Sequence, residues 1–207
     1  MASHLWWYVA RAGGLVAWAL VVASCTWGLL HALRTFGRRP TPAWMLSTHR
    51  YLSALALVFV AVHVVAILAD DFVQFSLADV LVPMLSTWHP LPVGLGIVAM
   101  YLLVAVEITS LVRARLTPKV WRAVHMASYV VLALSTIHLL SAGTDAKDLL
   151  PVTSAVLIGV ATVFGAAMLL TWRTAPKVRV GAPRPSGRGT PGGAAGGGAG
   201  PGLVTGP

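Results

Sequence analysis

The chain has 207 residues, of which 57% are hydrophobic and only 10% are charged, and its mean hydropathy is +0.79. A soluble domain carries charged residues at about a quarter of its positions, so this composition excludes an ordinary soluble protein and indicates an integral membrane protein. The single cysteine, Cys25, excludes an internal disulfide, a CxxC redox pair and a thiolate cluster. Any redox chemistry must therefore rest on other side chains and a bound cofactor.

Five apolar runs are each long enough to cross a bilayer as a helix, which takes about 20 residues. They cover approximately 13–33, 46–69, 91–112, 120–141 and 152–172. The first run continues past Cys25, and it is therefore longer than the apolar region of a cleaved signal peptide. We predict an all-α integral membrane protein, a five-span transmembrane helical bundle.

The charges between these runs are distributed asymmetrically. The connections after the first and third runs and the end of the fifth are basic: Arg34, Arg38, Arg39, Arg113, Arg115, Lys119, Arg122, Arg173, Lys177 and Arg179. The opposite side carries mainly acids: Asp70, Asp71, Asp79, Asp145 and Asp148. The positive-inside rule then places the N-terminus outside and the C-terminus in the cytoplasm. The net charge of +9 is a topology signal with anionic membrane lipid as its counter-charge, and it requires no nucleic acid.

These patterns divide the chain into three parts. Residues 1–12 are predicted to be a short extracytoplasmic N-terminus, and residues 13–173 the transmembrane domain. Residues 174–207 are rich in Pro, Gly and Arg. Such a segment cannot bury enough apolar surface to fold, so we predict a disordered basic cytoplasmic tail.

Two of the runs carry a pair of histidines each. His49 and His63 are 14 residues apart, and His125 and His138 are 13 apart. At about 1.5 Å per residue the separations are roughly 21 and 19.5 Å. One complete span lies between the two runs, so they cross in the same direction, and His49 matches His125 in depth as His63 matches His138. Two levels with one histidine from each helix have the geometry needed to hold two haems with two axial imidazoles each.

Other interpretations of the histidines compete with haem. Any single one could simply be hydrogen-bonded to a neighbouring helix. Two histidines per level without a nearby Cys or acid make a poor zinc site. One detail fits less well, because His125 and His138 end about 140° apart around an ideal helix, whereas His49 and His63 agree within about 40°.

The pattern His49-x13-His63, followed two spans later by His125-x12-His138, resembles the ferric reductase-like transmembrane superfamily. That superfamily includes NADPH oxidases, ferric metalloreductases and the haem subunit of the bacterial methionine sulfoxide reductase system. The resemblance implies that His49 and His125 ligate an inner haem b, and that His63 and His138 ligate an outer one. It also implies a multi-pass protein of a cell membrane, with a bacterial plasma membrane expected.

The family's N-terminal extra span and its flavin and NAD(P)H-binding domain have no counterpart in this sequence. We therefore expect an oxidoreductase subunit that depends on a flavin-containing or quinol electron-donor protein, with the flavin or quinone supplied by that partner. The specific function predicted is a di-haem b-type electron-transfer protein that passes electrons from a cytoplasmic flavoprotein or quinol to an extracytoplasmic acceptor. The alternatives are a quinol-linked cytochrome b subunit and a haem-free transporter or scaffold. No catalytic residue is assigned.

Basic residues near the inner level are candidates for contact with the haem propionates. Arg50 and Arg122 are predicted to bind the cofactor in this way, and Arg113, Arg115 and Lys119 lie near the same level. For any single one of these residues, topology and lipid contact alone are the simpler interpretation.

Three further polar residues have open roles. Glu107 is the sole acid inside a predicted span, where an unpaired carboxylate is costly, so we expect it to pair with a basic residue at the cytoplasmic end, with proton uptake as the alternative. His89 in an outer loop could sit over the outer haem edge or bind a metal substrate. His31, at the inner end of the first run, could line a quinone pocket.

Overall fold

Every regular element in the described part of the chain is helical. The computed structural model describes residues 4–32, 43–71, 73–143, 148–150, 152–154, 161 and 165. The elements are α1 (Leu5–Ala32), α2 (Ala43–Leu68), α3 (Leu77–Leu81), α4 (Pro90–Leu111), η2 (Arg113–Arg115), α5 (Pro118–Met126) and α6 (Ser128–Ala142). Among these residues, four segments are long and apolar enough to span a membrane, with α5 and α6 counted together. The predicted fifth span at 152–172 lies mostly outside the described residues, and the predicted tail lies entirely outside them.

The first helix begins earlier than predicted. α1 starts at Leu5 rather than near residue 13, so most of the segment expected as a short N-terminus forms its first turns. The charge of Arg11 and the pair Gly13 and Gly14 interrupt the apolar run in the sequence, but the preceding residues are apolar and aromatic and continue the helix. Trp and Tyr at the end of a span are typical of a membrane interface.

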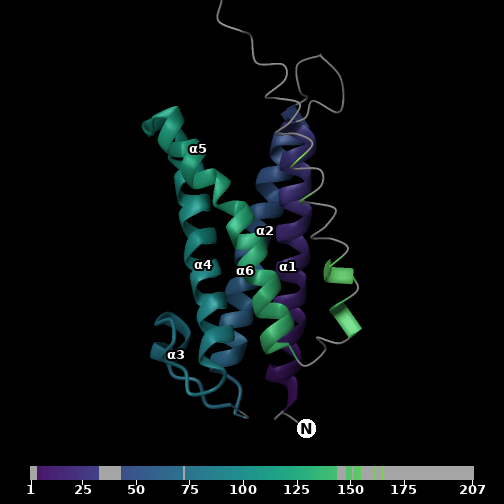
Figure 1. Ribbon diagram of the computed structural model, residues 1–207, viewed down its shortest axis with the longest axis vertical. Helices are drawn as coiled ribbons and strands as arrows, with labels where there is room; N and C mark the ends of the chain where they lie inside the picture. The colour runs from purple at the N-terminus through teal and green to yellow at the C-terminus, as the bar shows by residue number, and fades with distance from the viewer. Residues whose placement is uncertain are drawn as a thin grey trace, which may run out of the picture. The chain divides into compact units, whose positions relative to one another are not determined.

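The spans pack as two antiparallel pairs (Figure 1). α1 lies against α2, α4 lies against α6, and α1 also contacts α6. A central apolar cluster joins the pairs: Val21, Cys25, Ala56, Leu103, Val131 and Leu132. A part-buried hydrogen bond also joins α1 to α6, since Trp18 Nε1 donates to Thr136 Oγ1 at 2.9 Å. Many other large apolar side chains, such as Val58, are exposed, as expected for faces that contact lipid.

The fourth predicted span is interrupted. α5 ends at Met126 and α6 begins at Ser128, and between them the Ala127 N–H donates to Val124 O at 3.0 Å. A bond to the third residue back is a 3₁₀ turn, which rotates the chain by about 120° per residue instead of about 100°. In one ideal helix, His125 and His138 would point in directions roughly 140° apart. The overwound turn makes this angle smaller.

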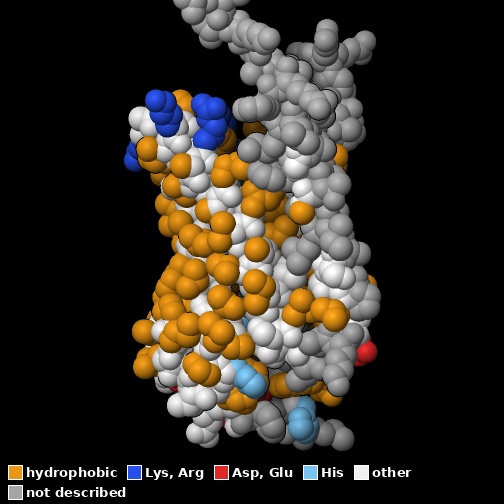
Figure 2. Space-filling model, viewed as in Figure 1, with side chains coloured by type: hydrophobic (Ala, Val, Ile, Leu, Met, Phe, Trp, Pro, Cys, Tyr) orange, Lys and Arg blue, Asp and Glu red, His pale blue; other side chains and the backbone are white. Residues whose placement is uncertain are grey.

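The two ends of the bundle carry opposite charges. Arg113 and Arg115 belong to η2, Lys119 and Arg122 belong to α5, and Figure 2 shows Lys and Arg gathered at that end. Asp70, Asp71 and Asp79 lie beyond the far end of α2 and on α3. The orientation of the basic end toward the cytoplasm stays a prediction.

The loop between α2 and α4 is ordered by a short capped helix. The Ser76 N–H and Oγ donate to Asp79 Oδ2 at 2.9 and 2.6 Å, and the Asp79 N–H donates to Ser76 Oγ at 3.3 Å. This reciprocal capping box starts α3. The bonds from the Ser76 side chain and N–H lower the pKa of the Asp79 carboxyl from its ordinary value of 3.8.

We expect Asp79→Asn to loosen α3 near neutral pH. Because the folded pKa of Asp79 is lowered, its stabilising effect is present above the ordinary value of 3.8 and is lost as the pH falls through the folded value. Amide hydrogen exchange over α3 should therefore differ between wild type and variant at neutral pH and converge in acid. A difference that persists unchanged in acid would contradict the role of the carboxylate.

Candidate cofactor site

At each of two levels, one imidazole from α2 lies next to one from the α5–α6 segment. The ring centres of His49 and His125 are 6.0 Å apart, with their planes at 75°. Those of His63 and His138 are 6.3 Å apart, with their planes at 80°. We call these the inner pair and the outer pair, after the predicted orientation. The structure thus brings together the residues that the two spacings matched in depth, while their role as ligands stays a prediction.

Three of the four imidazoles are held in the same way, by a hydrogen bond between Nδ1 and a main-chain carbonyl of a neighbouring helix. The contacts are His63 to Ala10 O at 2.6 Å, His138 to Pro92 O at 2.7 Å and His49 to Ser24 O at 3.1 Å. A carbonyl oxygen only accepts, so Nδ1 carries the proton and Nε2 keeps its lone pair. Metal-ligating histidines are held by their second nitrogen in this way.

A glycine one turn after each accepting residue makes room for the ring. Gly14 follows Ala10, Gly28 follows Ser24 and Gly96 follows Pro92, each by four positions. An added Cβ would lie 2.9 Å from His63 Nδ1 at Gly14, 3.2 Å from His49 Cε1 at Gly28 and 2.8 Å from His138 Nδ1 at Gly96. In a helix the residue four positions on donates to that same carbonyl, so its missing side chain uncovers the oxygen's second lone pair.

His125 is held differently from the other three. Its Nδ1 is buried and has no hydrogen-bond partner among the described residues. Its ring instead stacks on Trp121, with the ring centres 4.9 Å apart and the planes at 19°. Arg113 Cζ in turn lies 4.2 Å from the centre of the Trp121 ring. The inner pair therefore joins one hydrogen-bonded imidazole to one stacked imidazole.

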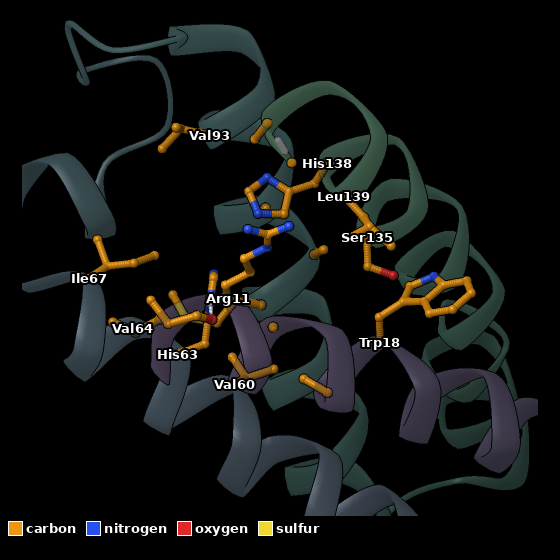
Figure 3. A pocket seen from close by; sticks show the side chains of 18 of the residues that line it. Arg11, Trp18, Val60, His63, Val64, Ile67, Val93, Ser135, His138 and Leu139 are labelled. Atoms are coloured by element: carbon orange, nitrogen blue, oxygen red, sulfur yellow. Dashed lines mark hydrogen bonds between the residues drawn. The ribbon is translucent and has the colours of Figure 1, made fainter. Parts of the chain in front are cut away.

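A cavity of about 340 Å³ adjoins the outer pair. Most of its lining is apolar, but His63, His138, Arg11 and Asp70 also contribute. Arg11 Cζ lies 4.8 Å from the centre of the Trp7 ring, and Figure 3 shows the Arg11 side chain reaching into the cavity beside the two imidazoles. No role was predicted for Arg11 from the sequence, whereas the structure places its guanidinium at the outer site.

The predicted arginine partners lie at the surface of the basic end. Arg50 and Arg122 are both exposed, and Arg122 Nε donates to Pro118 O at 3.3 Å. Arg122 also shares a small hollow with Arg113 and Trp121, which brings it near the inner pair through the stacked ring. The propionate-binding role of Arg50 and Arg122 stays a prediction.

Glu107 and His31 lie near the inner pair. Both interact electrostatically with His49. Glu107 is half-buried on α4, and the structure gives it no ion pair with any described residue, so the expected salt bridge is not found there. His31 Nδ1 is buried without a partner in the described ranges. The proton-uptake and quinone hypotheses for these two residues stay predictions.

His89 is in contact with a residue that lines the outer cavity. It is exposed and adopts the left-handed conformation, with φ of 43°, just before α4. Its ring centre lies 4.5 Å from that of Trp88, and Trp88 lines the outer cavity. The predicted roles of His89 at the outer haem edge or toward a metal substrate stay predictions.

The donor groups fit a metal carried by a flat macrocycle. No group of three or more His, Cys, Asp and Glu side chains that could hold a metal ion occurs in the described ranges, so each pair offers two nitrogens. A metal–imidazole bond of about 2.0 Å and a ring nitrogen about 1.2 Å from the ring centre put two trans imidazoles roughly 6.4 Å apart. The separations of 6.0 and 6.3 Å agree with that value. The residues present therefore fit haem.

Two imidazole pairs at two levels of a multi-pass helical bundle are the arrangement expected of a membrane electron-transfer component. The chain matches the family model described as ferric reductase like transmembrane component over residues 13–136, and it belongs to that family. The matched region includes His49, His63 and His125 and ends two residues before His138. The searches of curated proteins and of solved structures each found no match.

The sequence analysis did not identify the glycines or the aromatic residue that hold the imidazoles. A signal for two of the glycines was present, because Gly14 and Gly28 repeat the 14-residue spacing of His49 and His63 on the preceding run. Antiparallel neighbours with equal spacings meet at two levels. Gly96 had no comparable signal, since its role depends on which helices pack together. Trp121 had one, because it lies four residues before His125 on the same predicted helix, where side chains meet on one face.

Proposed function

We propose that this protein is a di-haem b-type electron-transfer protein, with the inner and outer histidine pairs as the axial ligands of the two haems. The observation that carries the proposal is the presence of two imidazole pairs at the separation expected of trans ligands, 6.0 and 6.3 Å. When bound, haem b supplies a one-electron Fe(III)/Fe(II) couple at each level.

The protein's own contribution is to orient the ligands and exclude water. The carbonyls of Ala10, Ser24 and Pro92 fix three ring orientations, and such bonds also raise the basicity of the ligating nitrogen. The central apolar cluster around Ala56, which is fully buried, lies between the two levels. This cluster excludes water from the space between the two levels. The reduction potential of each haem would then be set by its burial and by its ligands.

Positive side chains are available near each level for carboxylate groups of the cofactor. At the outer site the group is Arg11, which lines the cavity. At the inner site we propose Arg50 and Arg122, in accordance with their place near the basic end. A guanidinium binds a carboxylate through charge-assisted hydrogen bonds.

The two levels define a route across the membrane. A flavin-containing or quinol electron donor would act at the inner, basic end, and the acceptor would act at the outer end. Each haem iron would be held by both imidazoles of its pair, so an acceptor would not bind to the iron itself. Electrons would therefore leave through the exposed edge of the outer site.

The decisive experiment is a reduced-minus-oxidised visible spectrum of the detergent-purified protein, with haem quantified as the pyridine haemochrome. We expect a b-type spectrum and about two haems per chain, one for each pair of axial ligands. Purified protein without haem, after expression with an adequate haem supply, would refute the proposal and favour a transporter or scaffold. One haem per chain would refute the two-site form.

A further inference from the structure

The inner pair contains the one imidazole that lacks the hydrogen bond common to the other three. His49, His63 and His138 each direct Nδ1 to a carbonyl, but Nδ1 of His125 is buried without a partner among the described residues. An imidazole held only by its Cα–Cβ and Cβ–Cγ bonds can rotate between rotamers. Something else must therefore fix the plane of His125.

The contacts around His125 identify that element. Trp121 lies one helical turn before His125 on α5, where side chains four residues apart meet on one face. The two rings are nearly parallel, at 19° with centres 4.9 Å apart, which is an offset-stacked arrangement. The stack limits rotation of the imidazole, because turning the ring would bring its edge against the indole.

Arg113 completes the arrangement from a different element. Its guanidinium carbon lies 4.2 Å from the centre of the Trp121 ring, within cation–π distance. Arg113 belongs to η2, which precedes α5, so the contact ties the indole to the preceding turn. Arg113 also interacts electrostatically with His125. A positive charge therefore acts on the inner site through a fixed geometry.

We propose that Trp121, backed by Arg113, is a positioning residue that fixes the plane of the His125 imidazole and holds it at 75° to His49. The inference rests on the proposed haem-ligand role of the inner pair. It assigns the inner site a support built from an aromatic ring and a cation, where the outer site uses two hydrogen bonds to carbonyls. The two haem sites therefore respond differently to substitutions outside their ligands.

The test uses the electron paramagnetic resonance spectrum of the oxidised, haem-loaded protein. The anisotropy of a low-spin bis-imidazole haem depends on the angle between the two ring planes. Trp121→Leu should shift and broaden the signal of the inner haem and leave the outer signal unchanged, with haem content kept. Trp121→Phe should restore the inner signal because it keeps a ring for stacking. The inner signal is identified in His138→Ala, which removes an outer ligand.

The matched control is Trp44→Leu. Trp44 lies at the start of α2 and contacts Trp27 rather than a histidine, so both signals should stay unchanged. An unchanged inner signal in Trp121→Leu, or equal shifts of both signals, would overturn the proposal while the two-haem function stands. A wild-type protein without haem would instead refute the proposed function itself.

A second pair of variants decides the question if Trp121→Leu does not fold. Arg113→Gln removes the cation over the indole, and it should lower the midpoint potential of the inner haem because the reduced state loses a nearby positive charge. Arg115→Gln, in the same turn η2, removes an equal charge that has no contact with the indole. The ring plane is read from the electron paramagnetic resonance signal of the inner haem: a shift in Arg113→Gln that is absent in Arg115→Gln supports the proposal, and unchanged inner signals in both variants contradict it.

Discussion

His138→Ala should reduce the haem content from about two to about one per chain, with the inner haem retained, since each haem needs both of its axial imidazoles. The structure supports this separation because His138 pairs with His63 and not with His49 or His125. The variant also removes the donor to Pro92 O, which lies 2.7 Å from His138 Nδ1. Pyridine haemochrome quantification and redox titration measure the result.

The remaining haem should titrate as a single component. His49→Ala should give the complementary result, retention of the outer haem only. His89→Ala is the control for the outer end, because His89 is exposed and contacts Trp88 rather than an imidazole of the pairs. It should keep two haems. Loss of both haems in His138→Ala, with the fold intact, would show that the levels are not independent.

Gly96→Ala should have the second largest effect, loss of most of the outer haem with the inner haem retained. The added Cβ would lie 2.8 Å from both Nδ1 and Cε1 of His138, closer than real Cβ contacts allow. The ring would have to leave its bond with Pro92 O, and overpacking of this kind typically costs about 1–3 kcal/mol. The gain in helix propensity from Gly to Ala, about 1 kcal/mol, offsets only part of it.

Haem content and the thermal unfolding midpoint of the apoprotein and haem-loaded protein measure this effect. Gly94→Ala is the matched control on the same helix, since its Cβ would meet Met84 Sδ at 3.2 Å and no histidine. It should keep both haems. Gly28→Ala should have an effect of intermediate size at the inner site, because its Cβ would lie 3.2 Å from His49 Cε1. If Gly96→Ala binds two haems with unchanged potentials, the glycine is not needed to seat the ring.

The two sites differ in how their surroundings would tune them. At the outer site both imidazoles have a carbonyl acceptor, and at the inner site only His49 has one. Since a hydrogen bond at Nδ1 raises the basicity of a ligating imidazole, the outer pair would donate more strongly to a bound haem iron. Cations lie near both levels, with Arg11 at the outer cavity and Arg113 near His125, and each would favour the reduced state at its own site. The relative potentials of the two haems are therefore a property of the contacts around the ligands.

Much of this protein followed from composition and spacing alone. The apolar runs predicted α2 and α4 to within a few residues, because a bilayer requires long helices whose backbone groups are all satisfied internally. The spacings of His49 to His63 and of His125 to His138 predicted two histidine pairs at two depths, since the rise per residue of a helix is fixed. The fifth predicted span lies largely outside the described residues, and the predicted orientation remains to be measured.

Other features depended on packing and could not be derived from the chain order. The break at Ala127 and the position of Arg11 in the outer cavity each require knowledge of which surfaces meet. The absence of an ion pair between Glu107 and any residue that the structure describes belongs to the same group, because the sequence says which charges exist but not which ones come within reach.

The sequence by itself therefore determined the class of protein, the number of imidazoles and their depths, because hydropathy and helical rise are local properties. Only the tertiary structure decided how His49, His63 and His138 are held. The carbonyls uncovered by Gly14, Gly28 and Gly96, and the Trp121 ring beside His125, are local features of their own helices. Three of these four act on a histidine from another helix, and the side-by-side packing of α1 on α2 and of α4 on α6 brings them into contact.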